Sequence, residues 1–214
     1  MVNNASDNNE PVARHNSRAN LKRLLNKIIE EPERRAEITE DIESIFGQDK
    51  AVLALDMSGF SRMTHRHGIV YFLLMIQQMQ LISKPVIQEH NGLMIKAEAD
   101  NLLCLFDTVA DAVRTAGEII QRLSAVNVLL PEDQHLYASI GIGYGRVLNI
   151  EDQELFGDEV NLAFKLGEDI AGHGVILLTS AARGPLQDDE VRTREETLSI
   201  SGLSLSYHVV DAGD

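Results

Sequence analysis

The apolar run at 51–55 passes directly into an aspartate, Asp56, and then into the turn-forming residues 57–60. A run this continuous predicts a strand that is buried on both faces, because an exposed edge strand would alternate with polar residues. A carboxylate at the end of such a strand, before a sharp turn through Gly59, suits a hard divalent cation. The simpler alternative is that Asp56 only caps the turn. The run therefore fixes a core strand and leaves the role of the aspartate open.

The net charge of the chain argues against some kinds of binding partner. With 33 acidic residues against 19 Lys and Arg, the net charge is -14, which repels a phosphate backbone or an anionic membrane. We therefore expect no nucleic acid and no membrane as partner, and any phosphate ligand needs metal ions. The single cysteine, Cys104, lies in an apolar run and is expected to be a core residue. No stretch has the composition of a signal peptide or membrane anchor, so we expect a soluble, cytoplasmic protein.

Three parts follow from the pattern along the chain. Residues 1–17 are polar and are expected to form a disordered tail. Residues 18–48 form an N-terminal helical segment, with apolar residues three or four apart and Pro32 between two short helices. This segment either caps the domain or makes a dimer contact, or it only packs on the domain. Residues 49–211 form the main domain.

The main domain mixes strands and helices. The pattern predicts helices at 67–83, before Pro85, and at 109–123 and 158–169. It predicts a hairpin turn at Asn91-Gly92, two short strands flanking 96–100, and strands at 136–143 and 146–150 joined by a turn at 143–145. A strand at 175–178 and an alternating segment at 203–209 complete the order. Such an order predicts an α+β fold, with one mixed sheet and helices packed on it.

Two pairs of polar residues stand out in this frame. Asp100 lies at the tip of the predicted hairpin, so that it and Asp56 could bracket a pair of metal ions if their strands are neighbours. Asn161 and Lys165 are four residues apart and share one face of a predicted helix. A solvated polar stripe is the alternative explanation of that second pair. Spacing alone leaves both alternatives open.

Four segments, in order, resemble the catalytic domains of class III nucleotidyl cyclases. They are 54–63 (ALDMSGFSRM), 96–100 (KAEAD) with the apolar residues 103–106 after it, 140–147 (IGIGYGRV) and 156–166 (FGDEVNLAFKL). The resemblance covers about residues 50–210, and four motifs at compatible intervals are more specific than any one of them. It implies a ferredoxin-like mixed sheet with helices packed on it. The chain departs from the family at Ala99, where a glycine is usual.

The resemblance implies a metal site. In such cyclases two aspartates, here Asp56 and Asp100, hold two Mg²⁺ or Mn²⁺ ions at a nucleoside triphosphate, with Met57 beside them. Gly59 and Phe60 of the same motif would contact the nucleotide. The reaction is in-line attack of the ribose 3′ hydroxyl on the α-phosphate, which gives a 3′,5′-cyclic nucleotide and pyrophosphate.

Four further residues receive roles from the family pattern. Asn161 would orient the ribose, and Lys165 would stabilise the transition state where an arginine is usual. Lys96 and Glu154 would read the base, with adenine as the first choice, although both could be plain surface charges. A second departure is Ser201, which stands where many relatives place a lysine on the terminal phosphates.

The family divides its site between two protomers. The metal residues come from one protomer and the other residues from its partner, so that a single-domain chain must form a homodimer to work. We therefore predict a homodimeric adenylate cyclase, regulated by a partner acting through residues 18–48. Two alternatives remain open: a degenerate cyclase that binds nucleotide or protein without efficient turnover, and a scaffold.

Overall fold

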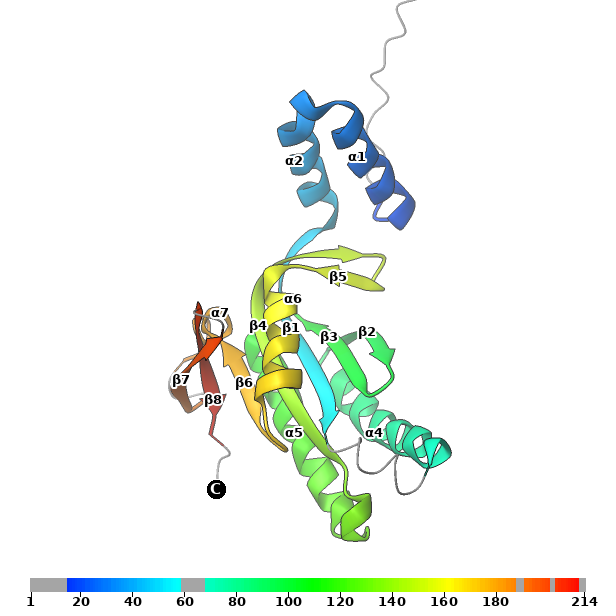
Figure 1. Ribbon diagram of the computed structural model, residues 1–214, viewed down its shortest axis with the longest axis vertical. Helices are drawn as coiled ribbons and strands as arrows, with labels where there is room; N and C mark the ends of the chain where they lie inside the picture. Colours follow the sequence, from blue (N-terminus) through cyan, green and yellow to red (C-terminus); the bar gives the residue numbers. More distant parts are fainter. Residues whose placement is uncertain (1–14, 59–67, 188–190, 201–202, 212–214) are drawn as a thin grey trace, which may run out of the picture.

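A single mixed sheet organises the chain. The computed structural model describes residues 15–58, 68–187, 191–200 and 203–211 (Figure 1). The strands follow the order β2-β3-β1-β4-β6-β8-β7, and β5 pairs with β4 beside this path. All pairings are antiparallel except that of β4 with β6. The predicted α+β fold with a mixed sheet is thus confirmed.

The strands are β1 Gly47–Ser58, β2 Leu93–Glu98, β3 Asn101–Phe106, β4 Tyr137–Ile150, β5 Glu154–Phe156, β6 Ile176–Thr179, β7 Thr193–Ile200 and β8 Leu203–Val210. The helices are α1 Arg18–Glu30, α2 Arg35–Phe46, α4 Ile69–Glu89, α5 Val109–Asn127, α6 Asp158–Phe164 and α7 Ser180–Arg183. Short turns η1 Pro32–Arg34 and η2 Glu132–Gln134 are 3-10 helical, and η3 Lys165–Ile170 is π-helical. The pattern missed β5 and β7, and it placed one helix over both α6 and η3.

The central strand β1 is buried on both faces, as its apolar run predicts. Leu53 and Leu55 belong to the large core that α4 and α5 cover. Val52 and Ala54 belong to a second cluster that contains Val160 and Ala163 of α6. Because side chains alternate along a strand, Asp56 continues the row of Val52 and Ala54, on the α6 side of the sheet.

The predicted turn at 143–145 is wrong, since β4 runs through it as one strand of 14 residues. The glycines serve close packing instead. A Cβ atom on Gly141 would lie 2.0 Å from the Ala163 carbonyl oxygen, and one on Gly143 would lie 2.5 Å from that of Glu159. Glycine therefore lets the backbone of α6 approach β4. The real turn follows at Glu151 and Asp152, both with φ 55°.

The predicted end of the first long helix is also wrong. The helix α4 continues through Pro85 to Glu89, and the Asn91-Gly92 turn connects α4 to β2 instead of two strands. Pro85 is exposed, whereas Val86 and Ile87 just after it are fully buried. The burial of these two side chains compensates for the backbone hydrogen bond that a proline removes.

One face of α4 stays uncovered. Its buried residues, such as Met75 and Met79, pack in the core, as in the central helix of a globular domain. By length and composition alone, α4 would also be long and apolar enough to cross a membrane, and it is the one such helix among the described residues. Its exposed apolar side chains are Ile69, Val70, Leu73, Leu74 and Leu81.

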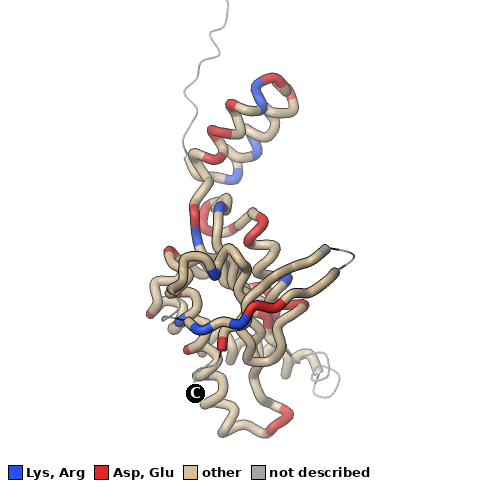
Figure 2. The backbone as a smooth tube through the Cα atoms, turned by 90° about the vertical axis from the view of Figure 1, so that its left-hand side faces the viewer, with Lys and Arg blue, Asp and Glu red and all other residues tan. Residues whose placement is uncertain are grey.

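The N-terminal helices pack on the domain at one end of the sheet (Figure 1). Leu24 of α1 and Phe46 of α2 share a small core with Ile150 of β4. Figure 2 shows the two helices projecting from the sheet, with charges of both signs along them. Of the expected tail, residues 1–14 lie outside the described residues, and Ser17 caps α1 by accepting from the Asn20 N–H. The α2 helix ends at Phe46 and β1 begins at Gly47, with no loop between them.

Candidate functional site

The two predicted metal-binding aspartates lie at neighbouring strand ends. Asp56 of β1 is directly opposite Asn101 of β3, the residue after Asp100. The Met57 N–H donates to the Asp100 carbonyl oxygen at 3.0 Å, which ties β1 to the hairpin tip, while the Met57 side chain is buried. The hairpin turns at Ala99, whose φ of 47° is unusual for a residue with a side chain. The structure thus brings together two carboxylates that are 44 residues apart in the chain.

The electrostatics of these aspartates suit a cation. Partial burial, the negative charge of Asp100 and that of Glu168 raise the pKa of Asp56 to about 7. Among the described residues, neither Asp56 nor Asp100 forms an ion pair. Divalent cations with oxygen ligands would relieve this repulsion, so the residues fit Mg²⁺ or Mn²⁺. Within the part of the chain that the structure describes, no three His, Cys, Asp or Glu side chains are grouped so that they could hold a metal ion by themselves.

Asn161 and Lys165 are one helical turn apart, as their spacing predicts. The Lys165 N–H donates to the Asn161 carbonyl oxygen at the end of α6. Glu159 fixes α6 to the sheet, because its Oε2 accepts from the Tyr144 N–H at 3.0 Å and from the Thr179 hydroxyl at 2.6 Å. The Lys165 ammonium pairs with Asp169. The helix is therefore rigidly placed, while the lysine is held by a neighbour.

Lys96 and Glu154 belong to elements that touch each other, β2 and β5. Lys96 is exposed and pairs with Glu98 at 2.9 Å. Glu154 is the first residue of β5 and pairs with Arg18, the first residue of α1. Each predicted base-reading side chain thus has a partner of opposite charge within the chain.

Comparisons with known proteins find similar sequences and similar folds. The chain is 31% identical over 137 residues to a Rhizobium meliloti (strain 1021) protein named "Putative adenylate cyclase 3". The matched region is 64% of this chain but only 23% of that protein. An adenylate/guanylate cyclase/hydrolase structure from Silicibacter pomeroyi matches with 29% identity and a TM-score of 0.62, over 77% of this chain and 95% of that one. The catalytic core of a rhodopsin-guanylyl cyclase has a TM-score of 0.66 at 16% identity, over 78% and 98%. No protein-family model matches the chain.

The fold is that of class III nucleotidyl cyclase catalytic domains. The matches support nucleotidyl cyclase activity in general terms, without deciding the base.

A third acidic residue near the pair was missed from the sequence. Glu168 belongs to the π-helical turn η3, which packs so closely that a Cβ on Gly167 would lie 2.9 Å from the Ala54 carbonyl oxygen. Partial burial and the charges of Asp169 and Asp100 raise the pKa of Glu168, while a hydrogen bond from the Asn101 side chain opposes that rise. No spacing rule could have found Glu168, because the helical periodicity changes within η3.

Some predicted residues of the cyclase motifs lie outside the described residues, namely Gly59, Phe60 and Ser201. Because Ser201 stands where many relatives place a lysine, another cation would have to bind the terminal phosphates. Two arginines considered for this role, Arg146 and Arg183, are used elsewhere. Arg146 pairs with Glu43 and Asp49, near the opposite end of β1 from Asp56. Arg183 donates to Thr193 and to the Leu186 carbonyl oxygen. The described structure therefore assigns neither arginine to the phosphates.

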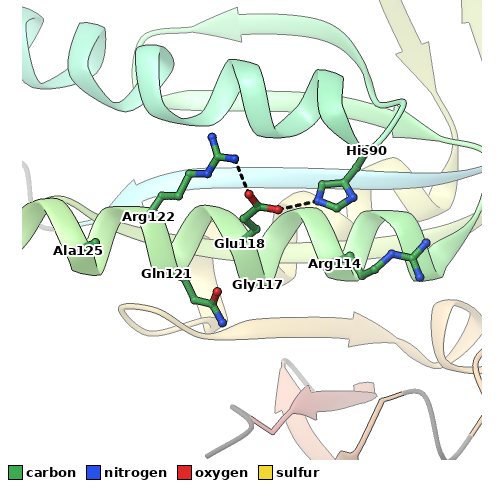
Figure 3. A pocket seen from close by; sticks show the side chains of 7 residues that line it. All are labelled: His90, Arg114, Gly117, Glu118, Gln121, Arg122 and Ala125. Atoms are coloured by element: carbon green, nitrogen blue, oxygen red, sulfur yellow. Dashed lines mark hydrogen bonds and ion pairs between the residues drawn. The ribbon is translucent and has the colours of Figure 1, made fainter.

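A separate hollow of about 500 Å³ lies where α5 meets the end of α4 (Figure 3). Glu118 lies at its centre and bonds to the His90 Nε2 at 2.8 Å and to Arg122, while Arg114 pairs with Asp111. These charges compensate each other, and none of the lining residues comes from the strand ends that carry the aspartates. The hollow is therefore not part of the candidate site at Asp56 and Asp100.

Proposed function

We propose that the chain is a nucleotidyl cyclase that converts a nucleoside triphosphate, with ATP preferred, into a 3′,5′-cyclic nucleotide and pyrophosphate. The observation that carries this proposal is the pair Asp56 and Asp100 at adjoining strand ends of a cyclase fold, unpaired within the described residues. Bound Mg²⁺ or Mn²⁺ would supply activation of the 3′ hydroxyl and neutralisation of the triphosphate. The chain spans about a quarter of the curated relative it matches, so the activity of the whole protein is part of the proposal.

The other residues would act on the nucleotide itself. Asn161 donates to the ribose and holds it for in-line attack, and Lys165 donates to phosphate oxygens as negative charge develops on them. Lys96 donates to a ring nitrogen of the base while Glu154 accepts from an exocyclic amino group. Adenine offers an acceptor next to such an amino group, which is the reason for placing ATP first.

We further propose that the active form is a homodimer, in which Asp56 and Asp100 of one protomer work with Asn161 and Lys165 of its partner. The uncovered apolar face of α4 supports association, because such a surface is costly to leave in water. The cytoplasmic location predicted from the sequence stays a prediction.

The direct test is a product assay on the purified chain with Mn²⁺ or Mg²⁺ and ATP, GTP, CTP and UTP in separate reactions. A cyclic product from ATP above all others is expected. A folded dimer that gives no product from any triphosphate would overturn the proposal.

Mixing two inactive variants tests the shared site. Asp100→Asn and Asn161→Ala each damage a different half, so that a heterodimer of the two keeps one intact site. At equal amounts, half of the dimers are mixed and half of their sites are intact, which predicts recovery of about a quarter of the wild-type activity. No recovery, with exchange of subunits demonstrated, would show that both halves act within one protomer.

A degenerate domain that binds nucleotide without efficient turnover is the second candidate. The pairing of Lys165 with Asp169 favours it, because a lysine already held by a carboxylate is a weaker phosphate donor than a free arginine. Binding of Mn²⁺-ATP without product formation would support this candidate over the first.

A further inference from the structure

Asn16, just before α1, and Arg18, the first residue of α1, are bonded to the hairpin of β4 and β5. The Asn16 amide donates to the Asn149 carbonyl oxygen at 3.0 Å, and its oxygen accepts from the Glu151 N–H at 3.0 Å. Two residues later, the Arg18 guanidinium covers both carboxylate oxygens of Glu154, with an Nε to Oε2 distance of 3.1 Å. Asn16 and Arg18 thus contact β4, the turn after it and the first residue of β5.

Packing holds this contact in place. Leu24 of α1 and Ile38, Ile42 and Phe46 of α2 form one buried cluster with Ile150, at the end of β4. Phe46 and Ile150 are almost fully shielded from water. Arg18 therefore reaches Glu154 as part of a docked helical pair and not as a free side chain.

This ion pair differs from the others at the candidate nucleotide site. Lys96 pairs with Glu98 on its own strand, and Lys165 pairs with Asp169 four residues on. Rotation of one side chain releases either lysine. The partners Arg18 and Glu154 are 136 residues apart, and they join two separate parts of the fold.

The Arg18 guanidinium and a nucleotide base would compete for the carboxylate of Glu154. An arginine that bonds both oxygens of a carboxylate takes up its best acceptor positions and neutralises its charge. A base amino group would need one of those oxygens. Glu154 is 26% exposed in its side chain, so the approach of a base to it is limited while Arg18 stays in place.

We propose that Arg18 withholds Glu154 from the nucleotide base while α1 is docked on the β4–β5 hairpin, so that docking of α1 and base binding oppose each other. The inference rests on the proposed function for the role of Glu154. It makes the N-terminal helices an inhibitory device of the same site, and any partner that draws α1 off the hairpin would increase the affinity for nucleotide.

Kinetics of Arg18→Ala in the full chain test this. We expect KM for Mn²⁺-ATP to fall about three- to fivefold, the range for breaking a partly exposed ion pair, with kcat unchanged. Arg18→Lys, which keeps the charge but loses the fork, should lie between the two. The matched control is Arg34→Ala, whose partners Glu31 and Glu37 are at the other end of α1 and in α2. An unchanged or raised KM in Arg18→Ala would overturn the inference.

Hydrogen exchange supplies a readout that does not need turnover. Saturation with 3′-deoxy-ATP and Mn²⁺, which cannot react because the attacking hydroxyl is missing, should speed exchange of the Glu151 amide and of the α1 amides. Unchanged exchange on demonstrated binding would contradict the competition.

The two experiments separate the possible failures. Product formation with equal KM in wild type and Arg18→Ala would remove the inference alone. Absence of product, together with tighter binding of 3′-deoxy-ATP to Arg18→Ala, would remove the proposed function alone. If neither protein binds the analogue, both are overturned.

Discussion

The metal end of the candidate site and its nucleotide-reading end differ in how their charges are balanced. At the metal end, Asp56 and Asp100 lie together and make no ion pair within the described residues. At the reading end, Lys96, Lys165 and Glu154 each have a partner of opposite charge. Among these five charged residues of the candidate site, the two without an ion pair in the described structure are the two that a metal ion would neutralise. The charges that would meet a nucleotide are held by neighbours until it arrives.

The strongest way to break this comparison is to remove one acid. Asp100→Asn should lower cyclase kcat about a thousandfold, or about 4 kcal/mol, because metal-based stabilisation of the transition state is lost. The measurement is pyrophosphate release with Mn²⁺-ATP. Asp107→Asn is the matched control, since Asp107 follows the other end of β3 and already pairs with Lys50. Equal loss in both variants would contradict a special role of Asp100.

The second prediction concerns stability. The folded-state pKa of Asp56, about 7, lies above its ordinary value, so that its contribution is fully present at low pH and is lost as pH rises from about 4 to about 7. At pH 8 without metal, Asp56→Asn should raise the free energy of unfolding by about 2 kcal/mol, less than the full shift implies because Asp56 is only half-buried. Thermal melts at pH 5 and pH 8 measure this.

Bound metal should make the wild type, and not Asp56→Asn, the more stable of the two proteins at pH 8. Mn²⁺ is expected to stabilise the wild type at pH 8 and to leave Asp56→Asn nearly unchanged, because binding to the native state raises stability by mass action. If the melting temperature of Asp56→Asn depended on pH and Mn²⁺ as that of the wild type does, Asp56 would not belong to a metal site.

The third prediction concerns Lys165, at the nucleotide-reading end of the candidate site. Lys165→Arg should raise kcat about tenfold, because a planar guanidinium donates two hydrogen bonds to a phosphate where an ammonium acts as a point charge. Lys84→Arg, an exposed change on α4, is the control. An unchanged or lower kcat in Lys165→Arg would argue that this lysine does not face the phosphates.

The smallest expected effect concerns the hairpin that carries Asp100. Ala99 has a positive φ, which costs an alanine about 1–2 kcal/mol, and glycine removes that cost while adding entropy to the unfolded chain. Ala99→Gly should therefore stabilise the protein by about 0.5–1 kcal/mol in urea unfolding. Ala97→Gly, within β2, should destabilise it instead. A loss of stability in Ala99→Gly would mean that the turn is not strained.

Much of the fold was predictable because apolar periodicity reports burial directly. The run ending at Asp56 gave the central strand, and the hairpin with Asp100 at its tip was found from two apolar segments around a polar one. The spacing of Asn161 and Lys165 placed them on one helix. The four motifs of the cyclase resemblance then indicated a ferredoxin-like mixed sheet, whereas the order of its strands came from the structure.

The failures have a common physical origin, which is that tertiary packing overrides local signals. The glycines of β4 looked like a turn, although they admit the backbone of α6. Pro85 looked like a helix end, although the burial of Val86 carries the helix past it. Neither Glu168 nor the contact of Arg18 with Glu154 could be predicted, because both depend on which distant segments meet.

The direct passage from α2 into β1 has a mechanical consequence. Asp56 is nine residues beyond Gly47 on one continuous strand, a distance of about 30 Å. Because no loop lies between α2 and β1, α2 cannot turn without moving the first residues of the strand that presents the aspartate. A displacement of α2 would therefore reach β1 through the backbone itself, and not through side-chain contacts alone.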